Sequence, residues 1–250
     1  MSLVTVTIFQ YKPRARFGAF ANMGRFLMQP IRADGLRFSK LMGSGLDYGL
    51  VPDLSTYVHL GVWESDAHAD AFRQTAPYRR LARGTEQIST LHLQPQRAHG
   101  LWDGQNPFIV GDQPTNRQTN EPTTNPATPI AVLTRATIRP GALPDFWRHV
   151  PAARQRLRDH ADHLLFGIGV GEVPVVQQCT ISVWRDSAAV ERYAYRQSGH
   201  REVVRLTRER NWYREELFAR FAVLRAEGPL FAKINWATGT PERISVAKPL

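Results

Sequence analysis

A short pattern occurs twice in this chain, and the two copies differ at a residue type that can bind a metal or carry a proton. The first copy begins at Val62-Trp63 and ends at Tyr78-Arg79-Arg80, and the second begins at Val183-Trp184 and ends at Gly199-His200-Arg201. In an alignment without a gap, His200 falls opposite Arg79. Because packing explains the residues that a duplicated scaffold shares, a histidine in only one copy indicates where chemistry takes place.

His200 is predicted to lie in the first turn of a helix that Ser198 caps. His200, Val203, Val204 and Thr207 share one face of that helix by their spacing, and the apolar neighbours predict that the imidazole points inward. An inward imidazole is often a core histidine bonded to a backbone carbonyl. A neutral imidazole on an apolar helix that faces a sheet is also what an axial heme ligand requires. The helix alone leaves both interpretations open.

Hydrophobic periodicity predicts the same order of elements in both halves of the chain. The first half has predicted strands at 4–8, 36–42, 57–63 and 89–93, and helices at 17–28 and 66–83. The second half has predicted strands at 130–138, 164–170, 176–184 and 217–224, and helices at 143–158, 188–196 and 198–210. This order, β-α-β-β-α-β twice, predicts an α+β fold of two tandem ferredoxin-like units packed as a pseudo-symmetric α/β barrel.

The predicted domains follow from this repeat and from the composition of the segment between its copies. Residues 1–111 form the N-terminal unit, and 130–227 form the C-terminal unit. Residues 112–129 are dense in Thr, Asn, Gln and Pro and are predicted to be an exposed linker. Residues 228–250 are predicted to be a tail.

Two polar residues of the second half are candidates for a binding site. Gln178 shares a strand face with Thr180 and Ser182, and such a face lines a cavity in a closed barrel but meets water in an open sheet. Arg135 lies on an otherwise apolar strand, where a buried guanidinium without an anion would be costly. Aromatic residues, which are core by default, are expected around a cavity and would suit a planar apolar guest: Phe146, Trp147, Phe166, Trp212, Phe218 and Phe221.

The composition narrows the class of protein. Of the 250 residues, 42% are hydrophobic and 22% charged, which is typical of a globular protein. The single cysteine, Cys179, excludes disulfide frameworks, thiolate zinc sites and iron–sulfur clusters within one chain. The net charge of +10 favours an ordinary basic surface first, and an acidic partner or anionic lipid second. Scattered arginines disfavour nucleic-acid binding, and the lack of a secretory signal or membrane-spanning run predicts a cytoplasmic protein with at most peripheral membrane contact.

Several blocks that span most of the chain, in order, carry a family resemblance. They include Lys40–Gly45, Gly100–Trp102, Leu133–Arg139, Gly167–Pro174 and Trp212–Phe221. In these blocks the chain resembles the spheroidene monooxygenase family, the acyclic carotenoid 2-ketolases. The resemblance implies a monooxygenase that holds heme b and inserts oxygen from O2 into a hydrophobic small molecule. It further implies a ferredoxin-type electron donor, and a homodimer is among the assemblies expected.

The resemblance extends to heme enzymes built from duplicated ferredoxin-like units, such as chlorite dismutases and aldoxime dehydratases. In those enzymes the proximal histidine lies on a helix of the C-terminal half, which implies His200 as the heme ligand here. Arg135 and Gln178 are then the expected distal residues, with Phe166 and Trp147 beside the cofactor. An enzyme of the aldoxime dehydratase type and a non-enzymatic heme or ligand-binding barrel are the alternatives.

Overall fold

The computed structural model describes residues 3–48, 50–108, 128–158, 163–193, 205, 207, 209–236 and 240–241. The strands are β1 (Leu3–Tyr11), β2 (Leu36–Gly45), β3 (Pro52–Trp63), β4 (Thr85–Gly100), β5 (Ile130–Ile138), β6 (Leu164–Gly171), β7 (Gln177–Trp184), β8 (Tyr213–Glu227), β9 (Ile234–Asn235) and β10 (Thr240–Pro241). The α-helices are α1 (Arg16–Met28), α2 (Asp66–Phe72), α3 (Ala76–Ala82), α4 (Leu143–Arg158) and α5 (Ser187–Glu191). Short 3-10 helices are η1 (Pro13–Ala15), η2 (Leu46–Tyr48), η3 (Pro140–Ala142) and η5 (Pro229–Phe231).

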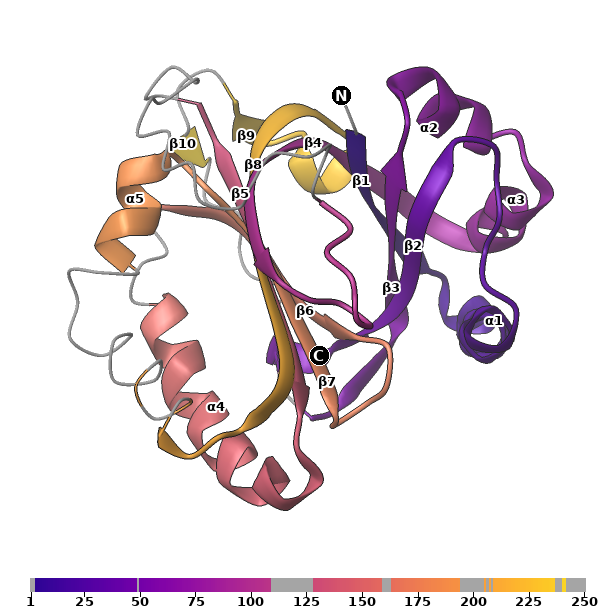
Figure 1. The fold of residues 1–250 in the computed structure, drawn as a ribbon. Helices are drawn as coiled ribbons and strands as arrows, with labels where there is room; N and C mark the ends of the chain where they lie inside the picture. The colour runs from indigo at the N-terminus through magenta and orange to yellow at the C-terminus, as the bar shows by residue number, and fades with distance from the viewer. Residues whose placement is uncertain are drawn as a thin grey trace.

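The strands form one closed antiparallel barrel in the order β1-β3-β2-β6-β7-β5-β8-β4 (Figure 1). Each half contributes the strand order of a ferredoxin-like unit, since β1 to β4 run 4-1-3-2 and β5 to β8 repeat that order. The halves join at a short contact between β2 and β6 and along a long contact between β4 and β8. The predicted α+β barrel of two ferredoxin-like units is confirmed.

The duplication seen in the sequence is also visible in local geometry. Ser65 caps α2 and Asp186 caps α5, and each side chain accepts a hydrogen bond from the backbone amide three residues later. The Trp63 ring lies 5.1 Å from that of Phe72 at 44°. The equivalent rings of Trp184 and Tyr193 lie 4.9 Å apart at 34°. The shared residues of the two copies therefore have the packing role that the repeat predicted.

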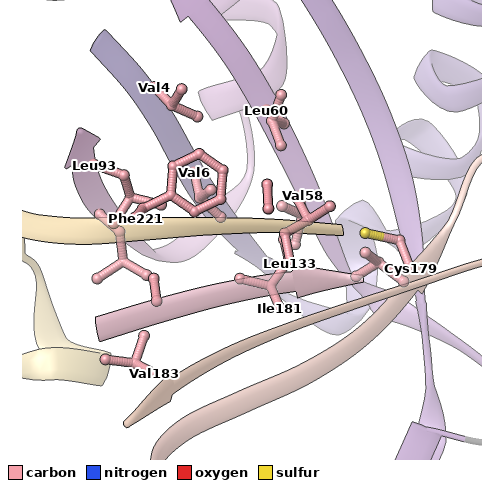
Figure 2. Packing of buried hydrophobic residues seen from close by; sticks show 14 of the residues in the cluster. Val4, Val6, Val58, Leu60, Leu93, Leu133, Cys179, Ile181, Val183 and Phe221 are labelled. Atoms are coloured by element: carbon pink, nitrogen blue, oxygen red, sulfur yellow. The ribbon is translucent and has the colours of Figure 1, made fainter. Parts of the chain in front are cut away.

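The inside of the barrel is a packed core rather than a binding cavity. Alternate residues of the strands point inward and pack together, as Val6, Leu60, Leu133 and Phe221 do in Figure 2. Residues from outside the main strands join this core: Trp102, Phe108, Phe231 and Ile234. The last two belong to the segment that was predicted to be a tail, and they are almost fully buried. The predicted domain boundaries stay predictions, and most of the predicted linker lies outside the described residues.

The outer faces of the two halves are covered by different helices (Figure 1). In the N-terminal half, α1, α2 and α3 bury a large apolar cluster that includes Phe9, Tyr57, Trp63 and Phe72. In the C-terminal half, α5 packs on β7, whereas the nearest elements beside α4 are η3 and η2. Among the described residues, none of the helices is long and apolar enough to cross a bilayer.

His59 makes the N-terminal layer sensitive to acid. Its ring stacks on Phe72 and forms a 2.9 Å hydrogen bond with the Ser39 hydroxyl, and burial lowers its pKa to about 4. Because the fold holds the neutral form, this part of the free energy of unfolding is complete above the ordinary histidine pKa of about 6.5 and is lost as the pH falls towards 4.

Urea denaturation at a series of pH values should show this loss, which is at most about 3 kcal/mol for a shift of this size. His92 also has a lowered pKa, so the measurement is the difference between the wild type and His59→Gln. A variant that keeps the full pH dependence of the wild type would show that His59 does not cause it.

Candidate functional site

The two halves differ most on the outer face of the sheet, beneath the helices. The strand registers define equivalent positions, because Leu3 pairs with Trp63 in the first half and Ile130 pairs with Trp184 in the second. From there, the pair Phe9–Tyr57 corresponds to the pair Ala136–Gln178. In the same way, His59 of β3 corresponds to Thr180 of β7. Their partners on the adjacent strands, Leu41 of β2 and Gly169 of β6, also correspond.

At each of these positions a large side chain of the N-terminal half is replaced by a smaller one in the C-terminal half. Phe9 and His59 are at most 1% exposed and fill the N-terminal layer. In the C-terminal layer Thr134 is exposed, while Gln178, Thr180 and Phe218 are only partly buried. The outer face of β5, β6, β7 and β8 is therefore flatter and less filled than its counterpart, as a site for a planar ligand requires.

Tyr48 from the N-terminal half lies on this outer face. A side chain added at Gly167 would collide with the Tyr48 hydroxyl, and one added at Gly169 would come within 3.0 Å of the Tyr48 ring and Cα. Tyr48 adopts a left-handed backbone with φ of 58°, which is uncommon for a non-glycine residue. The absence of side chains at Gly167 and Gly169 therefore lets the Tyr48 ring lie against β6.

The N-terminal end of α4 is fixed beside this face by aromatic and polar contacts. The indole N–H of Trp147 donates a 3.0 Å hydrogen bond to the carbonyl of Val175, in the turn between β6 and β7. The Asp145 carboxylate accepts hydrogen bonds from Arg210 and from the Trp212 indole, the latter at 2.8 Å. These bonds, with that of Arg210 first, lower the pKa of Asp145.

A second polar cluster lies on the opposite, inner face of the sheet, and it contains Arg135. The Arg135 side chain is 1% exposed and pairs with Glu215 and, at 3.2 Å, with Asp103. Its guanidinium also lies 5.5 Å from the centre of the Trp102 ring. Burial would raise the pKa of Glu215, but the amides of Gly104 and Asp103 and the Arg135 charge outweigh it and lower that pKa.

Lys40 extends the same cluster into the N-terminal half. Its ammonium pairs with Asp103 and, at 2.5 Å, with Glu172. The other carboxylate oxygen of Glu172 accepts a 2.8 Å hydrogen bond from the Trp102 indole. The cluster therefore links both halves to the segment that follows β4, and its charges compensate one another.

The structure separates the residues that were predicted to form one site. Gln178 lies on the outer face, and Trp147 lies in the helix layer that covers it. Arg135 and Phe166 lie on the inner face, where Phe166 packs against Phe231 at 5.2 Å between ring centres. Arg135 and Gln178 therefore cannot together line one distal pocket, which corrects that pairing. His200 lies outside the described residues, and its role stays a prediction.

Cys179 is buried in the barrel core, as predicted, and burial raises the pKa of its thiol. The thiol therefore stays protonated and packs as a small hydrophobe. Within the part of the chain that the structure describes, no group of three or more His, Cys, Asp or Glu side chains could hold a metal ion.

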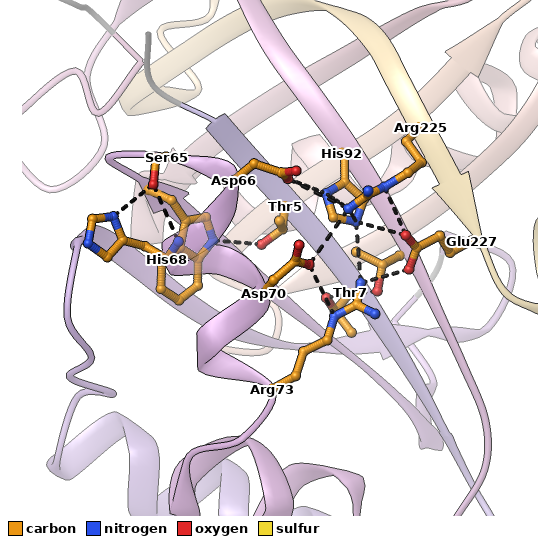
Figure 3. A network of polar contacts seen from close by, with 12 residues as sticks. Thr5, Thr7, Ser65, Asp66, His68, Asp70, Arg73, His92, Arg225 and Glu227 are labelled. Carbon is orange, nitrogen blue, oxygen red and sulfur yellow. Dashed lines mark hydrogen bonds and ion pairs between the residues drawn. The ribbon is translucent and has the colours of Figure 1, made fainter.

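A further ionic cluster, around His92, joins α2 to the end of β8 (Figure 3). Arg73 pairs with Glu227 at 2.7 Å, and Arg225 pairs with the same carboxylate at 2.8 Å. Burial and then the Arg225 charge lower the pKa of His92, which is 2% exposed. The charged side chains of this cluster are paired with one another around the His92 imidazole. The cluster therefore stabilises the contact between the two halves rather than forming an open site.

Comparison with known proteins places the chain in a family. A protein named spheroidene monooxygenase from Rhodobacter capsulatus is 36% identical over 211 residues, which are 83% of this chain and 84% of that protein. The chain belongs to the spheroidene monooxygenase family. Another member, from Cereibacter sphaeroides, is 34% identical over 229 residues, which are 90% of this chain and 67% of that protein. The family resemblance found in the sequence is confirmed, and the chain is an oxidoreductase of the monooxygenase class.

The fold of this family member is also similar to that of a solved aldoxime dehydratase in complex with butyraldoxime. The TM-score is 0.54, with 97% of this chain and 86% of that chain covered, at 9% sequence identity. At this identity the similarity shows the fold alone. No protein-family model matches the chain.

Proposed function

We propose that this chain is a heme-dependent monooxygenase that inserts one oxygen atom of O2 into an apolar, carotenoid-like molecule. Family membership carries the reaction class, and the name of the relatives, spheroidene monooxygenase, supports a carotenoid as substrate. We place the proposed site on the outer face of the C-terminal half. Its small residues Ala136 and Thr180 leave room for a planar group at positions that Phe9 and His59 fill in the N-terminal half.

A comparison with the N-terminal copy supports a position of His200 beside this face. The alignment without a gap pairs His200 with Arg79, but Arg79 is exposed on α3. The residues of α3 that pack on the sheet are Tyr78, Leu81 and Ala82. Their spacing equals that of His200, Val203 and Val204. With one inserted residue in the second copy, His200 would align with Tyr78.

The partner of Tyr78 on the sheet completes this comparison. The Tyr78 ring lies 5.8 Å from the Phe9 ring, edge to face. The residue equivalent to Phe9 is Ala136. A histidine at the Tyr78 position would thus face a sheet from which the opposing ring has been removed. We infer that heme b would occupy this space, where His200 would bind the iron and Trp147 would lie beside the cofactor.

Heme bound there supplies the activation of O2, and the residues of this chain position and protect it. We propose that the Gln178 amide, on the outer face, hydrogen-bonds the oxygen or a substrate carbonyl, and that Thr180 adds a hydroxyl beside it. Phe218, also on this face, offers an apolar contact to the substrate. Two electrons and two protons are needed to reduce the second oxygen atom to water. The basic surface suits an acidic, ferredoxin-type protein as the electron donor.

Arg135 and Phe166 have a different role in this proposal. Both lie on the inner face, so neither contacts the cofactor. Arg135 pairs with Glu215 of β8, and its strand β5 lies between β7 and β8. We propose that it holds these strands in register and so keeps the outer face flat.

The test compares the wild type with Ala136→Phe, which restores the ring present in the N-terminal half. Heme titration followed in the Soret region should give one heme per wild-type chain and little or none for Ala136→Phe. With a reductant, a ferredoxin and 18O2, the wild type should place labelled oxygen in an acyclic carotenoid, and the variant should not. Thermal unfolding checks that the variant is folded.

Phe9→Leu, at the equivalent position of the other half, is the matched control and should keep the heme. Heme binding by Ala136→Phe equal to that of the wild type would move the cofactor site elsewhere. Unlabelled product, or turnover of an aldoxime without a reductant, would contradict the monooxygenase reaction and favour the dehydratase alternative.

A further inference from the structure

The helix α1 carries an apolar stripe that nothing in the described part of the chain covers. Phe17 and Met28 are 84% and 86% exposed, and Phe20 and Leu27 are 55% and 50% exposed. At about 100° per residue, these side chains fall with Ala21 and Gly24 on one continuous strip of the helix surface. Ala19 and Met23 occupy the opposite side and pack on the sheet. The helix is therefore apolar on its buried face and on its exposed face.

Positive charge borders this stripe. By the same helical spacing, Arg16 lies along one border and Arg25 along the other. The basic residues of this region are all exposed and form no ion pair within the described residues: Lys12, Arg14, Arg16, Arg25 and Arg32. The first acidic residue of the whole chain is Asp34. An apolar ridge between cations, with no acidic residue near it in the sequence, is the pattern of a helix that lies in a membrane interface.

The repeat shows that the fold itself does not require this stripe. The turns η1 and η3 begin with Pro13 and Pro140, which makes α4 the counterpart of α1. Where α1 has Leu27-Met28, α4 has Arg154-Gln155. A side chain added at Gly24 would meet no atom within 4 Å, so packing inside the chain does not explain that glycine either. Leu27 and Met28 of α1 are thus apolar at positions that are polar in the other copy.

We propose that the exposed face of α1 docks this enzyme on an anionic membrane surface. The apolar side chains would enter the headgroup region, and the flanking arginines would pair with lipid phosphates. A second copy of this chain fits the face less well, because a twofold interface would place Arg16 and Arg25 against the same cations of the partner. The proposal of a membrane-docking surface rests on the observations about α1 alone. Only its use, to reach a carotenoid dissolved in the membrane, rests on the proposed function.

Co-sedimentation of the full chain with vesicles tests the proposal without any substrate or cofactor. Binding to vesicles that contain phosphatidylglycerol should exceed binding to pure phosphatidylcholine by at least about tenfold and should weaken as salt is added. Phe17→Ser combined with Met28→Ser should reduce binding at least about tenfold. Arg25→Glu should reduce it at least about fivefold, since it removes one cation and adds an anion.

The controls use exposed residues on other elements. Leu224→Ser removes an apolar side chain of β8 that is 56% exposed, and Arg97→Glu reverses an exposed charge on β4. Both should bind vesicles within about twofold of the wild type. Equal binding to both lipids, or equal losses in the controls, would overturn the proposal. So would a wild type that binds no vesicle but forms dimers that the α1 variants abolish, because the face would then join two copies of the chain.

Discussion

His200→Ala should yield a folded protein that no longer binds heme stoichiometrically and has no monooxygenase activity. A bond from His200 to the iron would be the main specific attachment of a heme at the proposed site. In the proposed alignment His200 corresponds to Tyr78, a side chain that packs on the sheet, so the substitution should remove a side chain and leave the fold intact. The heme content per chain, the Soret band and the thermal unfolding midpoint measure the three parts of this result.

His149→Ala is the matched control for this experiment. His149 lies on α4, 2.8 Å from the carbonyl of Asp145 and 5.2 Å from the Trp212 ring, so it is already engaged near the same layer. Its replacement should leave the heme content unchanged. Added imidazole should restore part of the Soret band of His200→Ala if the ligand position has been vacated. A His200→Ala protein with an unchanged Soret band would mean that another histidine binds the iron.

Local sequence pattern was sufficient for most elements but not for their lengths. The periodicity predicted strands at 89–93 and 217–224, whereas β4 spans Thr85–Gly100 and β8 spans Tyr213–Glu227. These strands extend because they pair with each other across the two halves, and such long-range pairing leaves no local signal. The helix predicted at 66–83 is divided into α2 and α3. Thr75 accepts a hydrogen bond from the amide of Tyr78, and Pro77 follows it, so the signal for this break was present in the sequence.

The site was predictable to the extent that the repeat could be read position by position. Gln178 was assigned to a polar strand face, and the structure puts it on the less filled outer face. Extending the alignment back from Trp63 and Trp184 without a gap pairs His59 with Thr180 and Tyr57 with Gln178. The replacement of Phe9 by Ala136 does not appear in that alignment and follows only from the strand registers. Tyr48 could not be foreseen, because it reaches the C-terminal sheet from the other half through a left-handed turn.

Arg135 shows that the sequence can indicate the need for an ionic partner without identifying that partner. The sequence indicated correctly that a buried arginine on an apolar strand needs an anion. The anions in the structure are carboxylates that lie 80 and 32 residues away in the sequence, Glu215 and Asp103. The requirement for a partner is local physics, but the identity of the partner is decided by which segments the barrel brings together.

Arg135→Leu should therefore lower the free energy of unfolding by about 3 kcal/mol, because it leaves the Glu215 carboxylate without its cation beside the barrel core. Urea denaturation measures the loss. Arg37→Leu is the matched control, since it breaks a pair with Glu64 in which both side chains are about half exposed and should cost under about 0.5 kcal/mol.

A second substitution separates the two explanations for Arg135. In Arg135→Leu/Glu215→Gln the orphaned charge is gone, while the new amide oxygen can still accept one of the two hydrogen bonds that the carboxylate accepts from the amides of Asp103 and Gly104. The double variant should recover at least about 1 kcal/mol relative to Arg135→Leu, because an unpaired buried charge costs more than a neutral group.

If Arg135 instead binds a heme propionate, Arg135→Leu would weaken heme affinity while the stability of the heme-free protein stayed close to that of the wild type. The two outcomes differ in which quantity changes, so one pair of titrations decides whether this arginine stabilises the barrel or contacts the cofactor.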